Sequence, residues 1–461
     1  MSENKQHLLS ISVPQILLQT NYHNVLYPRG LAALSSAGID LYAPEFNDVA
    51  TVIAGTVQHD AEPATRQGLG QRSISIDRGD LAQLLLDRAA ALPNVRVHYL
   101  HLLGGVDVAN SVVTFSIVGA EGTHVSQEYD LLVGADGVRS GVRSAMQDQV
   151  PGFTAKVVEE DQQYKTVELG DVRALRGYDP SLNWEDRAHF WTNARRGVAL
   201  LCPPRRGTAV SAALVLPRRG AHSFEAMGTT AESVSAFLMR ALPTLQRDVG
   251  DAQFGDVVRQ LLSGQAPRSN RTVYCSALAC GRMALVGDAA HAMSAALGQG
   301  VNSALETVAV LARELRCADD AALVKAEDVP AALRTFSARR LRDAHAVCRL
   351  SERRMGRTPL GRRLFALQLA CTQQLGKLGL AAPPVLFQLG KMDMPYSAIA
   401  ARQRRQVLAA YALLTAAALP AAMGVMLRSL RVPLLVYSLM AAIAAALRAI
   451  TASRTAKSTS S

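Results

Sequence analysis

The sequence predicts an α/β protein in which a mainly antiparallel β-sheet domain is inserted into a domain with a parallel sheet. Two short apolar runs typical of buried parallel strands, DLLVG at 130–134 and MALVG at 283–287, lie some 150 residues apart. Between them the chain changes to stretches punctuated by Gly and Pro, with alternating apolar residues. A long stretch with apolar residues at helical spacing follows the second run. The two runs are therefore assigned to one domain and the segment between them to another.

Composition and charge exclude several classes of protein. At 461 residues the chain exceeds the size of a single hydrophobic core, so we expect two soluble domains. Apolar residues make up 49% and charged residues 19%, which excludes a disordered chain. The net charge of +11 is spread over scattered Arg pairs without a basic patch interleaved with aromatic residues, so no nucleic-acid partner is predicted.

The cysteines and the N-terminal residues indicate a reducing compartment. Six cysteines lie far apart, without a Cys-x-x-Cys pair or a histidine at zinc-ligand spacing, so we expect structural thiols and no metal site. The N-terminal residues lack the charged start, apolar core and cleavage site of a secretory signal.

The first part of the parallel-sheet domain contains alternating strand and helix signals. SISI at 73–76 alternates as a strand, Asp77 is a helix cap, and residues 95–100 return to a strand, which together predict a β-α-β unit. SVVTFSIVG at 111–119 predicts a further strand, and YDLLVGADG at 129–137 predicts a central parallel strand.

Later changes of pattern set the domain boundaries. GVALLCPP and AVSAALVLP, in the middle of the chain, alternate as antiparallel strands. RMALVGDAAHAMSAALGQGVNSALETVAVLAREL then gives a strand, a glycine-rich loop and a long helix, so the chain returns to its first domain. The predicted domains are the parallel-sheet domain at 1–150 and 273–329, the antiparallel domain at 151–272, a helical region at 330–401, and a membrane anchor and tail at 402–461.

The strongest chemical signal is GDAAH at 287–291, followed at a fixed distance by GQGVN at 298–302. Asp288 is expected at the C-terminal end of a strand, where its carboxylate can accept hydrogen bonds from ribose hydroxyls. The glycines let the backbone approach a ring, and the N-terminus of the next helix offers N–H groups to an electron-rich oxygen. These are the requirements of a flavin nucleotide. An ordinary strand-to-helix turn explains a lone Gly-Asp pair, but not the whole pattern.

A second signal is the strand that ends in Gly-Ala-Asp-Gly, followed by Arg139, Ser140 and Arg143 on the next helix. Two arginines on one helical face suit a diphosphate or a nicotinamide cofactor that passes the C-terminal edge of the sheet. The alternative is a turn at Asp136 and a solvated face for the arginines.

These two motifs, in this order, resemble those of the FAD-dependent aromatic hydroxylases of the p-hydroxybenzoate hydroxylase type, and within that family the kynurenine 3-monooxygenases. The resemblance runs from about residue 19 to residue 402. It includes the Arg29-Gly30 pair, SISIDRGDLAQLLL, LPNVRVHY, YDLLVGADGVRS, the GDAAHA segment, LRDAHAVCRLS and MPYSAIAARQ. The fold that it implies is a Rossmann-like FAD-binding domain with an inserted, mainly antiparallel substrate domain.

The resemblance implies FAD as the cofactor, NADPH as the external reductant and an aromatic substrate. A flavin hydroperoxide is then the hydroxylating agent, so the protein supplies neither a metal nor a nucleophile. The residues that it assigns to the cofactor are Asp288, Gly298, Gly300, Val301, Asn302, Leu131, Asp136, Gly137 and Arg29.

The resemblance also assigns two residues to the substrate. Arg78 occupies the place of an arginine that holds an amino-acid carboxylate, and an arginine binds a carboxylate through two parallel hydrogen bonds. Tyr396 matches a tyrosine that touches substrate shortly before the membrane segment. The plainer alternatives are a surface ion pair for Arg78 and an interfacial anchor for Tyr396.

The chain departs from the family at its start. The family begins with a strand, a Gly-x-Gly-x-x-Gly turn and a helix, followed by an acidic residue, and none of these precedes Arg29. Gly68 and Gly70 lack the third glycine and are interpreted as part of a turn. We therefore expect an incomplete FAD-binding domain, as in a truncated gene model or splice form.

Other departures concern the substrate and the flavin loop. Leu92 stands where the kynurenine enzymes have a tyrosine, and Arg354 where they have an asparagine, so another aromatic acid is an alternative substrate. Ala295 replaces an expected proline, and Glu306-Thr307 an expected acidic pair.

Two apolar runs near the C-terminus predict membrane segments. Residues 406–427 are long enough to span a bilayer core of about 30 Å, whereas residues 432–447 span it marginally or lie at the interface. Arg402, Arg404 and Arg405 predict a cytosolic catalytic part, and the resemblance implies the outer mitochondrial membrane. The alternative is a pair of buried amphipathic helices.

Three functions are compatible with these residues. The first is an FAD- and NADPH-dependent monooxygenase that hydroxylates an aromatic, carboxylate-bearing, kynurenine-like substrate. The second is a catalytically dead, membrane-anchored remnant that cannot bind FAD. The third is a lipid-acting flavoenzyme of the same fold, in which a buried cation such as Arg78 has little use.

Overall fold

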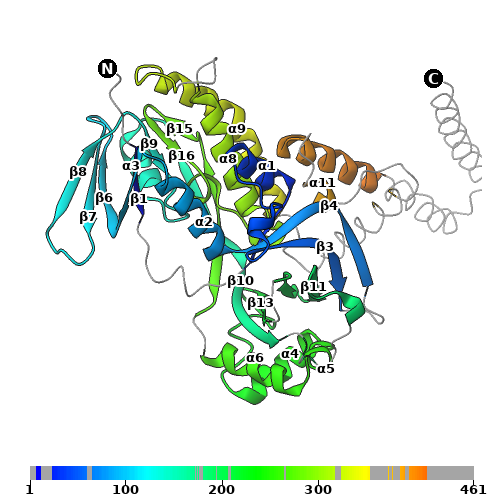
Figure 1. The fold of residues 1–461 in the computed structure, drawn as a ribbon. Coiled ribbons are helices and arrows are strands. Elements are labelled where there is room, and N and C mark those ends of the chain that lie inside the picture. The colour runs from blue at the N-terminus through cyan, green and yellow to red at the C-terminus, as the bar shows by residue number, and fades with distance from the viewer. Residues whose placement is uncertain are drawn as a thin grey trace, which may run out of the picture. The chain divides into compact units, whose positions relative to one another are not determined.

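The computed structural model describes residues 7–11, 23–59, 65–171, 173, 175, 180–193, 195–205, 209–263, 266–316, 323–352, 372, 376, 385–389 and 394–412. The chain divides into two compact units. The first comprises Met1–Phe365 and Val385–Ala400, and the second comprises Ala366–Pro384 and Ala401–Ser461. Every element that is labelled in Figure 1 belongs to the first unit.

A mixed sheet of eight described strands is the largest element of the first unit (Figure 1). In order across the sheet, the strands are β14 (Arg268–Cys275), β10 (Ala155–Asp171), β13 (Ala209–Pro217), β12 (Val198–Cys202), β11 (Arg187–Asn193), β3 (Ala50–Gln58), β4 (Thr65–Asp77) and β2 (His23–Leu26). All neighbours pair antiparallel except β11 and β3, which run parallel. The predicted antiparallel sheet is confirmed, and it also takes three strands from before residue 78.

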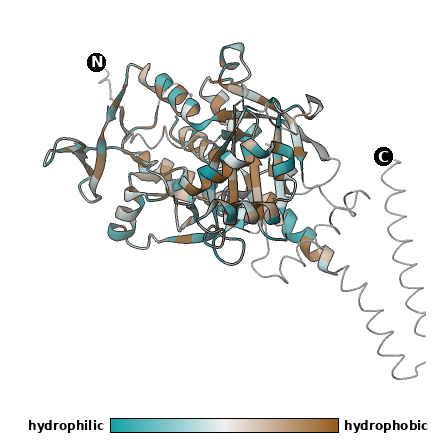
Figure 2. Ribbon diagram, turned by 90° about the horizontal axis from the view of Figure 1, so that it is seen from below, coloured by the Kyte–Doolittle hydropathy of each residue, from teal (hydrophilic) through white to brown (hydrophobic). Residues whose placement is uncertain are grey.

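Helices pack against this sheet and close an apolar core. They are α4 (Ala231–Ala241), α5 (Leu245–Val249) and α6 (Asp251–Ser263), and Figure 1 shows them together beside β10 and β13. Leu200 and Leu214 from the sheet share one buried cluster with Phe237 and Val257 from the helices. Burying a side chain of this size stabilises the fold by about 2 kcal/mol. In Figure 2 the interior strands are accordingly largely hydrophobic.

An aromatic and polar cluster joins β3, β11 and α5 within this core. The ring of Trp184 stacks on His189 with centroids 3.6 Å apart, and His59 Nε2 lies 2.9 Å from His189 Nδ1. The indole N–H of Trp191 donates to the Asp248 carboxylate at 2.8 Å. Burial lowers the pKa of His189 to about 2, with smaller contributions from His59 and Arg187, so the imidazole is neutral in the folded protein.

The predicted strand, cap and helix around Asp77 are confirmed. The strand lies in β4, and α2 (Arg78–Ala90) follows it. The Asp77 carboxylate accepts the N–H of Gly79 at 2.7 Å, as a helix cap does.

The predicted β-α-β unit is wrong in its pairing. The strand after the helix, β5 (Val95–Tyr99), pairs parallel with β1 (His7–Ile11) in a separate two-stranded sheet, whereas β4 pairs antiparallel with β3. The local pattern predicted each element correctly, but the partner of a strand depends on contacts far along the chain.

The described part of the first unit also contains two three-stranded sheets. The strands β6 (His101–Asp107), β7 (Val112–Ile117) and β8 (His124–Glu128) form an antiparallel sheet that lies apart from the large sheet in Figure 1. In the other sheet β9 (Leu132–Gly134) pairs parallel with β16 (Met283–Leu285), which pairs antiparallel with β15 (Ala279–Cys280). The two predicted buried strands are thus neighbours, so the return of the chain to its first sheet is confirmed.

Helices follow the ends of both parallel strands. Beyond β9 comes α3 (Gly141–Gln149), and beyond β16 come α7 (Asp288–His291), the 3-10 turn η5 (Ala295–Leu297), α8 (Gly300–Glu314) and α9 (Val329–Glu352). The remaining short elements are α1 (Pro28–Ser36), η2 (Pro44–Phe46), η4 (Pro180–Leu182) and α11 (Val385–Leu389).

Helix α1 packs very closely on α8. A Cβ atom at Gly30 would lie 2.5 Å from the Asn302 side-chain oxygen, closer than any real contact, so only glycine fits there. This approach brings the Arg29-Gly30 segment next to the glycine-rich loop, although the two are almost 270 residues apart in sequence.

The predicted membrane segments fall mostly outside the described residues. Residues 401–412 are helical, and the rest of 406–427 and all of 432–447 are not described. Among the residues that are described, no helix has both the length and the apolar character needed to cross a bilayer.

The neutral His189 makes the stability of the protein depend on pH. In the unfolded chain a histidine titrates near pH 6.5, whereas the folded pKa is about 2, so stability is full above pH 6.5 and falls as the pH is lowered. Between pH 7 and pH 5 this group should cost about 2 kcal/mol of unfolding free energy. His189→Phe keeps a stacked ring but has no group to titrate. Its unfolding free energy, measured by urea titration, should therefore fall by about 2 kcal/mol less than that of the wild type between pH 7 and pH 5. His124→Phe, at an exposed position on β8, is the control, and an equal pH dependence in all three proteins would contradict the assignment.

Candidate functional site

The two sequence motifs lie at the same edge of the parallel pair. Both β9 and β16 end there, and the N–H of Val286, just before the first motif, donates to the carbonyl of Gly134 in the second motif at 3.0 Å. A Cβ atom at Gly134 would lie 2.8 Å from Val142 and 2.9 Å from Leu285, so glycine is required for α3 to pack here. Ligands of open α/β sheets bind at this carboxyl edge.

Most side chains of the second motif are used by the fold. The Asp136 carboxylate accepts the N–H groups of Gly141 at 2.7 Å and Val142 at 3.1 Å, and thereby caps α3. Gly137 has a φ of +77°, which favours glycine. Leu131 is partly buried and packs against the apolar core. The predicted contacts of these residues with the cofactor stay a prediction.

Arg143 is structural, because its guanidinium connects the two motifs. It donates to the Ala289 carbonyl at 2.8 Å and to the Val138 carbonyl at 2.6 Å, and the residue is buried. Arg139 is exposed, which agrees with the alternative of a solvated position for this arginine.

Asp288 and Arg78 lie within electrostatic reach of each other. Residue Asp288 is exposed, yet desolvation by the surrounding protein raises the pKa of its carboxyl, and the Arg78 guanidinium opposes this only in part. Asp288 can therefore contact a ligand, and the protein around its carboxylate screens the charge less than bulk water would. The structure thus brings the residue predicted to bind ribose close to the residue predicted to bind a carboxylate.

The glycine-rich loop leads directly into α8. Gly298 has a φ of +61°, and its N–H donates to the Ala295 carbonyl at 2.9 Å, which closes the 3-10 turn before the helix. The helix begins at Gly300, so the first-turn N–H groups, including those of Val301, face outward from the helix start. A fifteen-residue helix also places a partial positive charge at this end.

The Asn302 side chain is fully occupied within the protein. Its oxygen accepts the Tyr27 N–H at 2.7 Å, and its amide group donates to the Val25 carbonyl at 2.9 Å and the Gly298 carbonyl at 3.0 Å. If Asn302 contacts the cofactor as predicted, it must therefore do so through its backbone N–H and not through its side chain.

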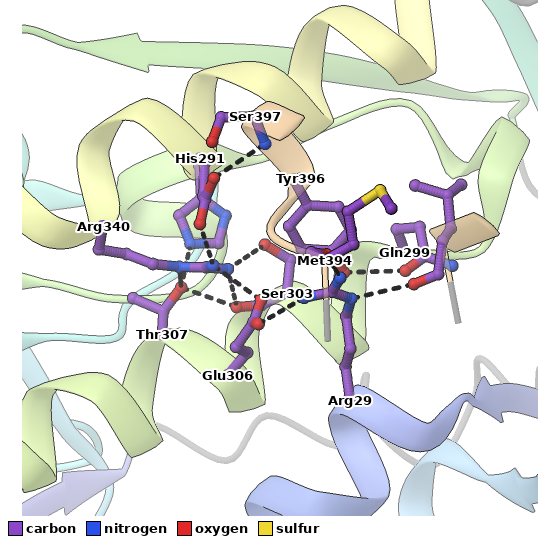
Figure 3. A network of polar contacts seen from close by, with 12 residues as sticks. Arg29, His291, Gln299, Ser303, Glu306, Thr307, Arg340, Met394, Tyr396 and Ser397 are labelled. Atoms are coloured by element: carbon purple, nitrogen blue, oxygen red, sulfur yellow. Dashed lines mark hydrogen bonds and ion pairs between the residues drawn. The ribbon is translucent and has the colours of Figure 1, made fainter. Parts of the chain in front are cut away.

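A buried charge network lies behind this loop (Figure 3). The Glu306 carboxylate bridges two arginines, with one oxygen 2.8 Å from Arg29 and the other 2.7 Å from Arg340. The arginine side chains are only 3% and 2% exposed, so the glutamate pairs with two cations that water scarcely reaches. Asp343 adds a second carboxylate, 4.0 Å from Arg340. Arg29, predicted to contact the cofactor, is thus engaged in an internal ion pair.

Arg340 links this network to the GDAAH helix. Its Nε donates to the Thr307 hydroxyl at 2.9 Å, and that hydroxyl donates to the Ser303 carbonyl at 2.7 Å. His291 Nε2, 2.8 Å from the same hydroxyl, must then carry the proton and donate. Burial, aided by Arg340, lowers the pKa of His291 to about 3, so the ring is neutral.

Tyr396 completes the network from the C-terminal side. Its ring faces the Arg29 guanidinium, 4.4 Å from the ring centre, and its hydroxyl donates to the Gln299 side-chain oxygen at 2.9 Å. Arg29 also donates to the backbone oxygens of Leu389, at 3.0 Å, and of Met394. The tyrosine is 0% exposed, and burial raises the pKa of its hydroxyl, which stays protonated. Its predicted contact with substrate stays a prediction.

Sequence reasoning missed Arg340 and the central role of Glu306. The available signal was position, because Arg340 lies on the face of α9 that also carries the buried residues Phe336, Ala344 and Val347. A charged residue at a core-facing position of a helix is seldom buried without a partner. The other departures are less informative, since Leu92 is exposed and Arg354 lies outside the described residues.

Comparison with known proteins gives matches over most of the chain. The family model described as "FAD binding domain" matches residues 25–351. The chain is similar to violacein synthase of Chromobacterium violaceum, with 34% identity over 243 residues that cover 51% of this chain and 52% of that protein. It is also similar to kynurenine 3-monooxygenase of Stenotrophomonas maltophilia, with 29% identity over 334 residues, 70% of this chain and 66% of that protein. The matched part thus spans about half to two thirds of the length of these relatives.

Solved structures share the fold at low identity. The tetrameric form of 2-methyl-3-hydroxypyridine-5-carboxylic acid oxygenase has a TM-score of 0.55 and 20% identity, covering 83% of this chain and 86% of that chain. PqsL of P. aeruginosa in complex with 2-aminobenzoylacetate has a TM-score of 0.56 and 18% identity, covering 75% and 88%. The predicted α/β fold with an antiparallel sheet is confirmed by these matches.

Removing the charge of Glu306 should destabilise the protein strongly. In Glu306→Gln the almost fully buried Arg29 and Arg340 lose their short ion pairs with Glu306, and Arg340 keeps only the longer one with Asp343, so the unfolding free energy should fall by about 3 kcal/mol. The control is Glu159→Gln, because Glu159 also stands between two arginines, Arg218 and Arg271, but at the surface. Urea titration should show a much smaller effect for the control. Equal effects would mean that the buried network is not what stabilises this region.

Proposed function

The chain belongs to the FAD binding domain family, and from that premise we propose that it is an FAD- and NADPH-dependent monooxygenase that hydroxylates an aromatic, carboxylate-bearing, kynurenine-like substrate. The observation that carries the proposal is the position of Asp288 shortly after β16, at the edge where β9 and β16 end side by side, with the charge of Arg78 acting on its carboxyl. One site then offers an acceptor for ribose hydroxyls and a cation for a substrate carboxylate.

The residues at this edge fit a flavin nucleotide. Asp288 is exposed and ionisable, so it can accept two hydroxyl hydrogen bonds from the sugar chain of the cofactor. The α8 N-terminus, with Gly300 and Val301, offers N–H groups to a ring oxygen and favours negative charge there. When bound, the reduced flavin supplies the activation of oxygen, and NADPH supplies the electrons.

The protein's own part is binding, orientation and protection from water. Arg78, at the first position of α2, would hold the carboxylate of the substrate and so fix the ring to be hydroxylated. The neutral His291 and the protonated Tyr396 supply no proton acceptor of suitable pKa, so we assign them no step of proton transfer. A relative of similar sequence is named for kynurenine, an aromatic amino acid, which agrees with a site for an acidic aromatic compound.

We also propose that residues 406–427 and 432–447 anchor the chain in a membrane with the catalytic part in the cytosol. The support is their apolar sequence and the basic residues that precede them. The outer mitochondrial membrane as their location rests on the resemblance alone.

Flavin binding is the first property to measure. We expect the full chain to bind FAD, and Asp288→Asn to raise the dissociation constant about 30-fold, because hydrogen bonds to a charged acceptor are lost. Titration of FAD, followed by absorbance and by quenching of flavin fluorescence, measures both proteins. Asp130→Asn, at an exposed position, should bind as the wild type does. A wild-type chain that binds no FAD would favour the non-catalytic remnant.

Arg78 distinguishes an acidic aromatic substrate from a lipid. We expect Arg78→Leu to lower kcat/KM for a kynurenine-like acid about 100-fold in an NADPH oxidation assay, since the carboxylate loses its counter-charge. Arg88→Leu, on the exposed face of the same helix, should have little effect. A reaction with a neutral lipid that survives the Arg78 change, with no turnover of acids by the wild type, would support a lipid-acting enzyme instead.

A further inference from the structure

Side-chain hydrogen bonds hold the loop at residues 298–302 from two sides. On one side, the Asn302 amide donates to the Gly298 carbonyl and to the Val25 carbonyl of β2, so the loop is fastened to the sheet. On the other side, the Tyr396 hydroxyl donates to the Gln299 side chain. Gln299, Asn302 and Tyr396 are each 0% exposed, so water does not compete for these hydrogen bonds.

The orientation of the Gln299 amide follows from its two partners. Its Nε2 donates to the Leu297 carbonyl at 3.3 Å, which leaves Oε1 to accept the tyrosine hydroxyl at 2.9 Å. The backbone oxygen of the same residue accepts the Ser303 N–H at 2.8 Å, the hydrogen bond that starts the first turn of α8. Tyr396 is therefore connected, through one side chain, to the point where the loop becomes the helix.

Tyr396 is itself held firmly. Its ring contacts the guanidinium groups of Arg29 and Arg340, 4.4 and 5.7 Å from the ring centre, and Glu306 fixes both of these arginines (Figure 3). The next residue is fastened as well, because the Ser397 N–H donates to the Asp343 carboxylate at 2.8 Å. A tyrosine hydroxyl with this support has little freedom to move away from Gln299.

We propose that Tyr396 is a positioning residue that fixes the 298–302 loop through Gln299 and makes no contact with substrate. The inference rests on the proposed function in one respect, because this loop presents the α8 N–H groups to the flavin. The tyrosine has no exposed surface, and its one hydroxyl proton is used by Gln299. It thus gives the C-terminal segment at 394–400 a role in shaping the cofactor site.

The test removes only the hydroxyl. Tyr396→Phe keeps the ring next to both arginines, so the fold should persist while the loop loses one of its two hydrogen-bonded attachments. Hydrogen–deuterium exchange of the full chain without cofactor should show about fivefold faster exchange in the peptide that covers residues 298–303, as expected for one lost hydrogen bond. Tyr42→Phe is the matched control, because Arg72 also lies over that ring at 4.0 Å and the Tyr42 hydroxyl has no hydrogen-bond partner among the described residues. Exchange that is unchanged in Tyr396→Phe would overturn the inference.

A second measurement separates positioning from substrate contact. With FAD and NADPH, Tyr396→Phe should lower kcat about fivefold and leave the KM for the aromatic acid unchanged, since the loop and not the substrate is disturbed. A raised KM with an unaltered loop exchange would assign the tyrosine to the substrate and overturn the inference. If the wild-type chain binds no FAD, the proposed function fails, while the exchange experiment still decides whether Tyr396 fixes the loop.

Discussion

The carboxylate of Glu306 is the group on which the rest of the site depends. It is the counter-charge of Arg29 on α1 and of Arg340 on α9, two cations that are almost fully buried. Burial removes the hydration of both guanidinium groups, so without Glu306 they would repel each other with only the longer pair of Arg340 with Asp343 in compensation. Since Arg29 also donates to the backbone of Leu389 and Met394, this one side chain joins three helices to the C-terminal segment of the first unit.

Most side chains of the two motifs stabilise the carboxyl edge of the β9–β16 pair, and few are available to a ligand. Asp136 caps a helix, Arg143 ties the motifs together, and Asn302 fastens the loop to β2. These side chains are satisfied by the protein and add little chemistry of their own. Asp288 and Arg78 differ, because one residue is exposed and the other partly so, and the Arg78 charge lowers the pKa of the Asp288 carboxyl against the effect of burial. This difference is why the proposed chemistry rests on that pair.

The departure at Glu306-Thr307 has a physical consequence. The resembled family is expected to carry two acidic residues there, whereas this chain has one carboxylate and one hydroxyl. The Thr307 hydroxyl accepts from Arg340 and from the neutral His291, and donates to Ser303. A second carboxylate in that place would favour a charged imidazole and alter the charge balance of the buried network. The threonine therefore suits a neutral His291, which donates to its hydroxyl.

From the sequence alone, local patterns predicted the strand before Asp77, its cap and helix, and the strands that lead into the two motifs, because each depends on neighbours within a few residues. The predicted turn at Gly68 and Gly70 is wrong, since both lie inside β4. The sequence also predicted that the two motifs belong to one sheet, since parallel strands are recognisable by their apolar runs. The partners of β4 and β5, the burial of Arg340 and the use of Asn302 by Tyr27 were decided only by the tertiary structure. Pairing and burial depend on contacts between residues far apart in the chain, and a local pattern does not specify which distant group supplies a counter-charge or a hydrogen bond.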